Sequence, residues 1–255
     1  ELAKEILPGL DKRTSGELRK QLTKRGVEFK LNTSIDAIND KTVNFSDGET
    51  KEFDAVLIAV GRSPLTENIG LDNVNIVSEN GFINVDLDTF ETSVENIFAL
   101  GDIVNNTPQL AHAAFAEAIS AITYIASGEK KPLDYKAIPY VVYTRPELAE
   151  IGLNAEKAKL ENIDIEQSQH SFTGVGRAMI TEQNQGLVKV YAEKEGPIVG
   201  ASVCGPSAGE MIHELMYMVG WEALPEEAAE FIHAHPTLSE AVGESLLGLT
   251  GKGLH

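Results

Sequence analysis

The sequence contains a single cysteine, Cys204, which excludes an intrachain disulfide bond. The surrounding residues, PIVGASVCGPSAGEM, predict a buried apolar strand followed by a loop rich in glycine and proline. A small hydrophobic side chain suits such a strand, so we expect a structural thiol here and not a reactive one. Without a disulfide framework, the expected compartment is a reducing cytoplasm.

Long apolar runs and an excess of positive charge are also missing. The longest apolar run, AVLIAVG at residues 55–61, is too short to span a bilayer, and the first ten residues lack the pattern of a secretory signal. The net charge of −18 at pH 7 argues against a nucleic-acid partner, because the phosphates would be repelled. We therefore expect no membrane segment, and partners that are small molecules or other proteins.

The first sixty residues predict an α/β arrangement. A short amphipathic helix is expected over residues 12–26, with Gly26 as its stop. Strands are expected at residues 27–35 and on either side of Asp47-Gly48, a dipeptide typical of tight turns. The continuous apolar run at residues 53–61 predicts a strand buried on both faces.

The rest of the chain predicts a helix-containing segment and then an α+β domain. ENIFALGD, residues 95–102, predicts a strand, and residues 110–127 predict an alanine-rich helix that is apolar on nearly all sides and therefore largely buried. Beyond about residue 137, strands bunch together with helices set to one side. The expected strands are 138–144, 163–172, 186–193 and 196–205, and the expected helices are 154–161, 207–219, 225–233 and 237–248.

HAHPTLSE, near the carboxyl end, carries the strongest indication of chemistry. Pro236 suits the first position of a helix and disfavours helical geometry at His235, so His235 should point away from the helix that follows. His233 and His235 could bind a metal, but the further ligands that a site needs are scarce, with only His213 and Glu240 as candidates. A histidine beside a carboxylate makes a general base near neutral pH, so we prefer His235 paired with Glu240 and expect no metal.

Two further stretches are compatible with ligand binding. Gly101 and Asp102 end the expected strand, where an aspartate can accept hydrogen bonds from ligand hydroxyls or can simply cap the loop. His112 lies in the first turn of the apolar helix, where a cofactor ring could meet the backbone N–H groups or where the histidine could be an ordinary surface residue. Neither stretch decides between its two interpretations.

The order and spacing of these and other stretches resemble one known family over nearly the whole chain. The sequence is similar to the dihydrolipoamide dehydrogenases, which are flavin-dependent pyridine nucleotide disulfide oxidoreductases. The matching stretches are ILPGLD (6–11), KLNTSI (30–35), VGRSP (60–64), NIFALGDI (96–103), LAHAA (110–114), IPYVVYTRPELAEIGL (138–153), GRAM (176–179), CGPSAGEMIHE (204–214) and HAHPTLSE (233–240).

The resemblance implies three parts, which are the later part of an NAD-binding domain (1–66), the returning part of an FAD-binding domain (67–136) and a dimerisation domain (137–255). The fold class is thus α/β and α+β, with partial doubly wound domains before the α+β domain. The residues implied at FAD are Asp102, for the ribityl chain, and Gln109, Leu110, Ala111 and His112, which would line the flavin ring mainly through their backbone. The residues implied at NAD are Gly61 and Ile35, which would border it, and Glu1, at the position of the family's acidic residue for the adenine ribose.

The resemblance also implies the chemistry of the HAHPTLSE stretch. His235 would be the catalytic base and Glu240 its orienting partner, both acting on the redox disulfide of the other subunit in a homodimer. His233 would be a supporting residue, and the His235–Pro236 bond would be cis. The implied partner is the lipoyl domain of a 2-oxoacid dehydrogenase or glycine cleavage complex, and the electrons would pass through FAD to NAD.

The sequence departs from the family in what it omits. It has no Gly-x-Gly-x-x-Gly string before a helix and no pair of cysteines four residues apart, all of which the family places upstream of Glu1. We therefore expect roughly the second half of an enzyme, inactive alone. Glutathione-reductase-like, mercuric-reductase-like and transhydrogenase-like flavoenzymes remain alternatives, as does a dimerisation fragment without catalysis.

Overall fold

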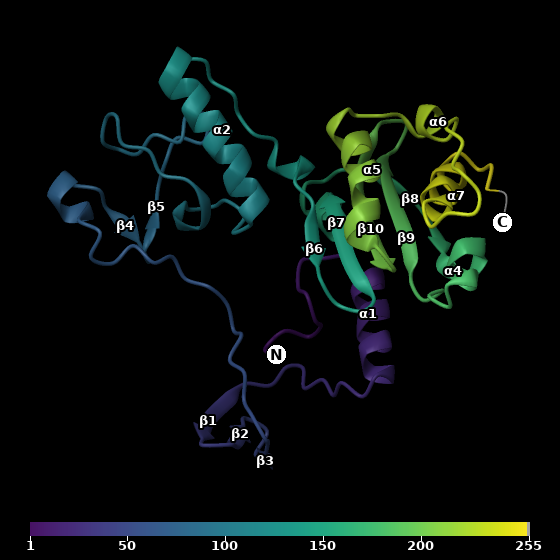
Figure 1. Ribbon diagram of the computed structural model, residues 1–255, viewed down its shortest axis with the longest axis horizontal. Coiled ribbons are helices and arrows are strands. Elements are labelled where there is room, and N and C mark those ends of the chain that lie inside the picture. Colours follow the sequence, from purple (N-terminus) through teal and green to yellow (C-terminus); the bar gives the residue numbers. More distant parts are fainter. Residues whose placement is uncertain (254–255) are drawn as a thin grey trace. The chain divides into compact units, whose positions relative to one another are not determined.

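The computed structural model describes residues 1–253, which form two compact units (Figure 1). The first unit joins Glu1–Val56 to the residues from Lys136 onward, and the second comprises Leu57–Tyr135. Within the described residues, no helix is long and apolar enough to cross a membrane. Helices and strands are mixed along the chain, which confirms the α/β and α+β fold class.

The first unit is built on a five-stranded antiparallel sheet with the order β6-β7-β10-β9-β8. The sequence predicts four of these strands and misses β7, because Glu147 and Glu150 interrupt its apolar pattern even though Glu150 is buried. The bounds are β6 Tyr140–Val142, β7 Glu147–Gly152, β8 Ile165–Ser171, β9 Leu187–Glu193 and β10 Ile198–Gly205.

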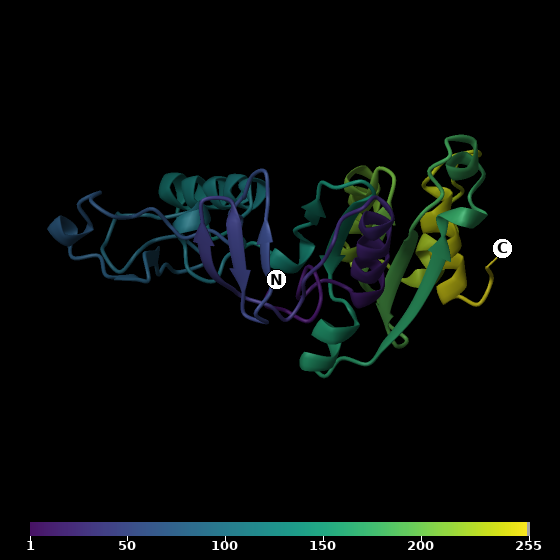
Figure 2. The same cartoon turned by 90° about the horizontal axis from the view of Figure 1, so that it is seen from below.

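Helices cover both faces of this sheet (Figure 2). Side chains alternate between the two faces along a strand. In β10, Ala201 joins the core beneath α5 (Ala208–Gly220) and α7 (Glu240–Leu249), whereas Cys204 joins a smaller cluster beneath α1 (Lys12–Lys24). The main hydrophobic core therefore lies on the side of the sheet that carries α5 and α7.

Helix α1 has the ends that its sequence predicts. The Asp11 side chain accepts hydrogen bonds from the backbone N–H groups of Arg13 (3.0 Å) and Thr14 (2.9 Å), which caps the first turn. At the other end, Gly26 has φ +91°, a left-handed conformation that favours glycine. The prediction of a helix closed by Gly26 is confirmed.

The remaining elements of the first unit are short, and two predicted helices differ in extent. The helix expected over residues 225–233 is limited to α6, and the helix expected from residue 237 begins at Glu240, so Pro236 does not occupy a first helical position. The short elements are β1 Ile35–Asn39, β2 Thr42–Phe45 and β3 Thr50–Glu52, which form a separate antiparallel sheet, and η3 Tyr135–Ala137, α3 Ala155–Leu160, η4 Phe172–Gly174, α4 Gly176–Ile180 and α6 Pro225–Ala228.

Two strand predictions in the first sixty residues are wrong. The apolar run at residues 53–61 forms no strand, and Leu57 and Val60 are each 90% exposed. Residues 27–34 are also irregular, and a strand begins only at Ile35. A strand buried on both faces needs neighbouring strands and covering helices, and the described residues supply none for this run.

The second unit has one long helix, α2 (Ala111–Ser127), over a small core. The strand expected at residues 95–102 is wrong, because only one isolated bridge joins Phe98 to Glu91 and a 3-10 turn follows. The prediction that α2 is largely buried is also wrong, because only one of its faces packs within the unit. The other face exposes Phe115, Ile119, Ile122 and Ile125. The short elements are η1 Leu71–Val74, β4 Ser78–Glu79, β5 Phe82–Ile83 and η2 Gly101–Ile103.

Candidate active site

The turn before α7 places a histidine against a carboxylate. His235 Nδ1 lies 2.8 Å from Glu240 Oε1, and the His235–Pro236 peptide bond is cis. The imidazole is 76% exposed, whereas the Glu240 side chain is 25% exposed. When Nδ1 carries the proton and donates a hydrogen bond to the carboxylate, Nε2 is the basic nitrogen of the ring.

Glu240 is held at the start of α7 by a second contact. Its Oε2 accepts the Thr237 N–H at 2.8 Å, and the Thr237 hydroxyl donates to the Ala234 carbonyl at 2.7 Å. Burial acts to raise the pKa of Glu240, but the Thr237 N–H and the two nearby histidines outweigh it and lower that pKa. The group therefore stays a carboxylate at neutral pH and can orient an imidazole or stabilise its charged form.

His233 and His213 each contact a partner other than His235. His233 Nε2 lies 2.6 Å from Glu214 Oε1, and His213 Nδ1 lies 3.2 Å from the Glu210 carbonyl of its own helix. Across residues 1–253, no group of three or more histidine, cysteine, aspartate or glutamate side chains is arranged to hold a metal ion.

The residues implied at FAD lie together in the second unit. Asp102 is exposed in η2, and its carbonyl accepts a hydrogen bond from Gln109 Nε2 at 3.2 Å. Leu110 precedes α2 in an extended conformation and gives the helix no side-chain cap, and Ala111 and His112 begin it. An exposed carboxylate beside a helix start without a side-chain cap is an arrangement that fits a ligand with hydroxyl groups and an electron-rich ring.

Two residues that organise the group around Asp102 were not predicted from the sequence. Arg62 donates to the Gln109 carbonyl and places Nη1 3.5 Å from Asp102 Oδ2. Glu117 is fully buried, and its carboxylate accepts the Gly101 N–H at 2.6 Å and the Tyr135 hydroxyl at 3.0 Å. The available signal was a glutamate in a helix that the sequence predicts to be buried. A buried carboxylate needs hydrogen-bond donors, so such a residue indicates a polar contact.

The residues implied at NAD are divided between the units. Glu1 is exposed, and its carboxylate accepts the Ala3 N–H at 2.8 Å. Ile35 begins β1 in the same unit and is half-exposed. Gly61 belongs to the second unit and has φ +139°. The roles of these three residues stay predictions.

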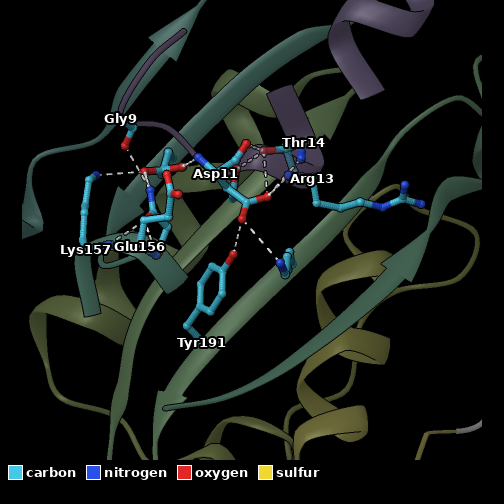
Figure 3. Close-up of polar contacts among 11 residues, drawn as sticks. Gly9, Asp11, Arg13, Thr14, Glu156, Lys157 and Tyr191 are labelled. Carbon is cyan, nitrogen blue, oxygen red and sulfur yellow. Dashed lines mark hydrogen bonds and ion pairs between the residues drawn. The ribbon is translucent and has the colours of Figure 1, made fainter. Parts of the chain in front are cut away.

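A buried polar network lies beneath α1 and is drawn in Figure 3. The Asp11 carboxylate accepts the Tyr191 hydroxyl at 2.5 Å and lies 3.3 Å from Lys189 Nζ. Its backbone N–H donates to Glu150 at 2.6 Å, and Glu150 also contacts Lys157 at 2.9 Å. These contacts join the amino-terminal segment to the sheet, and the sequence offers no periodic pattern that predicts them.

Cys204 is fully buried, as the sequence predicts. Burial, and to a lesser degree the charge of Glu17, raises the pKa of the Cys204 thiol to about 12. Because the thiolate is the reactive form, we expect Cys204 in the native protein to be alkylated roughly 10³-fold more slowly than an ordinary cysteine at neutral pH. Mass spectrometry of the Cys204 peptide after iodoacetamide treatment, with and without urea, measures this. Equal labelling in both samples would contradict a structural thiol.

Comparison with known proteins assigns the chain to a family. The family description "Pyridine nucleotide-disulphide oxidoreductase" matches residues 1–118, and "Pyridine nucleotide-disulphide oxidoreductase, dimerisation domain" matches residues 138–246. The chain belongs to the pyridine nucleotide-disulphide oxidoreductase family.

Within that family, the similar proteins include dihydrolipoyl dehydrogenases, which confirms the resemblance noted from the sequence. The chain is 40% identical over 262 residues to that of Geobacillus stearothermophilus, covering 99% of this chain and 55% of the relative. It is 36% identical over 265 residues to that of Haloferax volcanii, covering 100% and 55%. The solved structure of LpdA from Mycobacterium tuberculosis matches with a TM-score of 0.86 at 26% identity, over 97% of this chain and 55% of that one. The chain thus spans about half the length of these relatives.

Proposed function

We propose that residues 1–255 are the carboxyl-terminal portion of an NAD-dependent dihydrolipoamide dehydrogenase. The observation that carries the proposal is the His235–Glu240 pair, with Nδ1 and Oε1 2.8 Å apart, in a chain similar to dihydrolipoyl dehydrogenases. An imidazole held by a carboxylate is suited to remove a proton from a thiol near neutral pH.

In this proposal, His235 Nε2 accepts the proton of one dihydrolipoyl thiol. The resulting thiolate attacks one sulfur of a redox disulfide that lies outside these 255 residues, and the other sulfur leaves as a thiolate. The second dihydrolipoyl thiol then gives its proton to the enzyme thiolate and attacks the lipoyl sulfur of the mixed disulfide, which releases the oxidised lipoyl group and the other enzyme sulfur. The proton on His235 passes to that sulfur, which leaves the enzyme dithiol. Glu240 keeps the proton of His235 on Nδ1 and stabilises the imidazolium while it exists.

Bound FAD and NAD would carry the electron pair from the dithiol to the nicotinamide. Asp102 would accept hydrogen bonds from the FAD ribityl hydroxyls, while Arg62 fixes the Gln109 carbonyl and so the entry into α2. The backbone of residues 109–112 would border the flavin ring. Gly61, Ile35 and Glu1 would border NAD. The assignment of residues 1–66, 67–136 and 137–255 to NAD, FAD and dimerisation domains belongs to the same proposal.

The proposed assembly is a homodimer, with lipoyl domains of a 2-oxoacid dehydrogenase or glycine cleavage complex as transient partners in the cytoplasm. The match to a dimerisation domain supports the dimer. So does an exposed apolar surface around α5, on which Tyr217 and Trp221 pack with ring centroids 5.2 Å apart. Nearby in sequence, Phe231 and Ile232 are 74% and 98% exposed, and a second copy of the chain would cover such side chains.

The test compares substrates in the full-length protein. We expect NAD-linked oxidation of dihydrolipoamide at least about 10²-fold faster than NAD(P)H-linked reduction of glutathione disulfide, because the chain is similar to dihydrolipoyl dehydrogenases. The chain of 255 residues alone should show no turnover, because it has one cysteine and no redox pair. Preferred turnover of glutathione disulfide would move the protein to the glutathione-reductase-like alternative. A full-length protein inert with both substrates would support a fragment that serves dimerisation alone.

A further inference from the structure

A second histidine–carboxylate pair lies directly beside the first. His233 Nε2 is 2.6 Å from Glu214 Oε1, on helix α5, while His235, two residues later, contacts Glu240 on α7. The His233 side chain is only 14% exposed, whereas that of His235 is 76% exposed. The His233–Glu214 pair, here called the inner pair, is therefore enclosed by the fold. The His235–Glu240 pair, here called the outer pair, is exposed on the same turn.

The position of the His233 imidazole is restricted by Glu214 on one side and by Gly243 on the other. The hydrogen bond to Glu214 raises its pKa, although burial opposes that shift, so the pair gains the strength of a charge-assisted bond. On its other side lies Gly243 of α7, where an added Cβ would be 2.6 Å from His233 Nδ1. The imidazole thus fills a space between α5 and α7 that a side chain at residue 243 would occupy.

We propose that Glu214 and His233 form a positioning pair that fixes the turn at residues 233–237 between α5 and α7 and thereby sets where His235 stands. This inference rests on the proposed function, because it concerns the same base. His233 acts through the backbone and through Ala234, whose carbonyl accepts the Thr237 hydroxyl at 2.7 Å. Thr237 in turn donates its N–H to Glu240, the partner of His235. The peptide bond to Ala234 and these two hydrogen bonds therefore connect His233 to Glu240.

The charges near the inner pair come from few groups. Glu214 and Glu240 are the carboxylates that act on His233, and His235 and His233 both act on Glu240. Removal of the Glu214 charge lets His233 become neutral as well, so the sum of the two charges changes little. The expected consequence for His235 is therefore a displacement, which lowers the rate of proton removal, and a small displacement at a reacting group costs up to about 10²-fold in rate.

The experiment uses two reactions of the full-length enzyme. Oxidation of dihydrolipoamide by NAD needs the base, whereas reduction of a quinone dye by NADH takes electrons from the flavin without thiol deprotonation. For Glu214→Ala we expect kcat with dihydrolipoamide to fall about 10-fold or more while the dye reaction stays within about 2-fold. Glu210→Ala, one turn earlier on α5 and exposed, is the matched control and should change neither reaction.

Three further variants separate positioning from a general loss of folding. Glu214→Gln keeps a hydrogen-bonding group and should recover part of the activity that Glu214→Ala loses. His233→Ala combined with Glu214→Ala should be no worse than either alone, because a pair acts as a unit. Gly243→Ala places a better helix-forming residue in α7 and should still impair dihydrolipoamide oxidation alone, because its Cβ displaces His233.

The outcomes divide cleanly. Equal losses in both reactions, additive losses in the double variant, or full activity in Glu214→Ala would each overturn the positioning role. If His235→Gln also leaves dihydrolipoamide oxidation unchanged, the proposed function itself has failed. If His235→Gln is inactive while Glu214→Ala and Gly243→Ala are normal, only the positioning role has failed.

Discussion

Replacement of His235 by glutamine in the full-length protein is expected to lower the rate of dihydrolipoamide oxidation by about 10²–10⁴-fold, the usual contribution of a general base. Glutamine approximates the size of histidine and can still bond to Glu240, but it has no nitrogen that accepts a proton near neutral pH. Stopped-flow measurement of flavin reduction by dihydrolipoamide isolates the affected half of the reaction. Flavin content and NADH-dependent dye reduction should stay normal.

Two controls make this expectation specific to His235. His213→Gln changes an exposed histidine whose Nδ1 contacts the Glu210 carbonyl of its own helix, and its rates should be those of the wild type. Glu240→Gln keeps an oxygen for the Thr237 N–H but removes the negative charge beside Nδ1, so its loss should be substantial yet smaller than that of His235→Gln. Unchanged flavin reduction in His235→Gln would exclude the role of base.

The sequence alone predicts the outer pair because its signal is local. A proline after His235 and a glutamate five residues later lie in one short turn, and the observed contact of 2.8 Å needs no distant segment. The same holds for the end of α1, where Gly26 acts within one turn of the helix. Contacts of this local kind can be predicted without knowledge of the fold.

Contacts between distant segments could not be predicted in this way. Glu214 and His233 are 19 residues apart, and Asp11 is 180 residues from Tyr191. A glutamate such as Glu117 resembles a surface residue until the fold brings the Gly101 N–H and the Tyr135 hydroxyl to it. Burial of a carboxylate depends on such donors, and their spacing in the sequence carries no periodicity.

Burial was overestimated for two apolar segments. The apolar run at residues 53–61 and the outer face of α2 have the composition of core elements, yet Leu57 is 90% and Phe115 is 71% exposed. Composition reports the surroundings for which a segment is suited. It does not report whether those surroundings are present in a given stretch of chain.

The buried carboxylate of Asp11 gives the second large expectation, which concerns stability. Asp11 is 4% exposed and is the only carboxylate in the described residues within 4.0 Å of Lys189 Nζ, itself 9% exposed, while it also caps α1. Asp11→Ala would leave the buried ammonium and the Tyr191 hydroxyl without this acceptor. Removal of one member of a buried pair costs about 3–5 kcal/mol in the free energy of unfolding.

Hydrogen exchange followed by mass spectrometry can measure that loss in the full-length protein. A change of about 3–5 kcal/mol corresponds to roughly 10²-fold or faster exchange of amides in α1, β9 and β10. Lys12→Ala is the matched control, because its ion pair with Glu156 is exposed and should contribute less than about 1 kcal/mol. Equal protection in Asp11→Ala and wild type would show that the network does not hold α1 to the sheet.

The dependence on pH follows from the same contacts. Burial acts to raise the pKa of Asp11, but the Tyr191 hydroxyl, the Thr14 N–H and the Lys189 charge outweigh it and hold that pKa below its ordinary value of 3.8. A lowered pKa means that the stabilisation is present above about pH 4 and is lost as the pH falls through the pKa of the folded state. The difference in protection between wild type and Asp11→Asn should therefore be constant from about pH 5 to about pH 7, where Asp11 is ionised in both the folded and the unfolded state, and should shrink below about pH 4. A difference that grows on acidification would mean that Asp11 is protonated in the folded protein, and that its contact with Lys189 is not an ion pair.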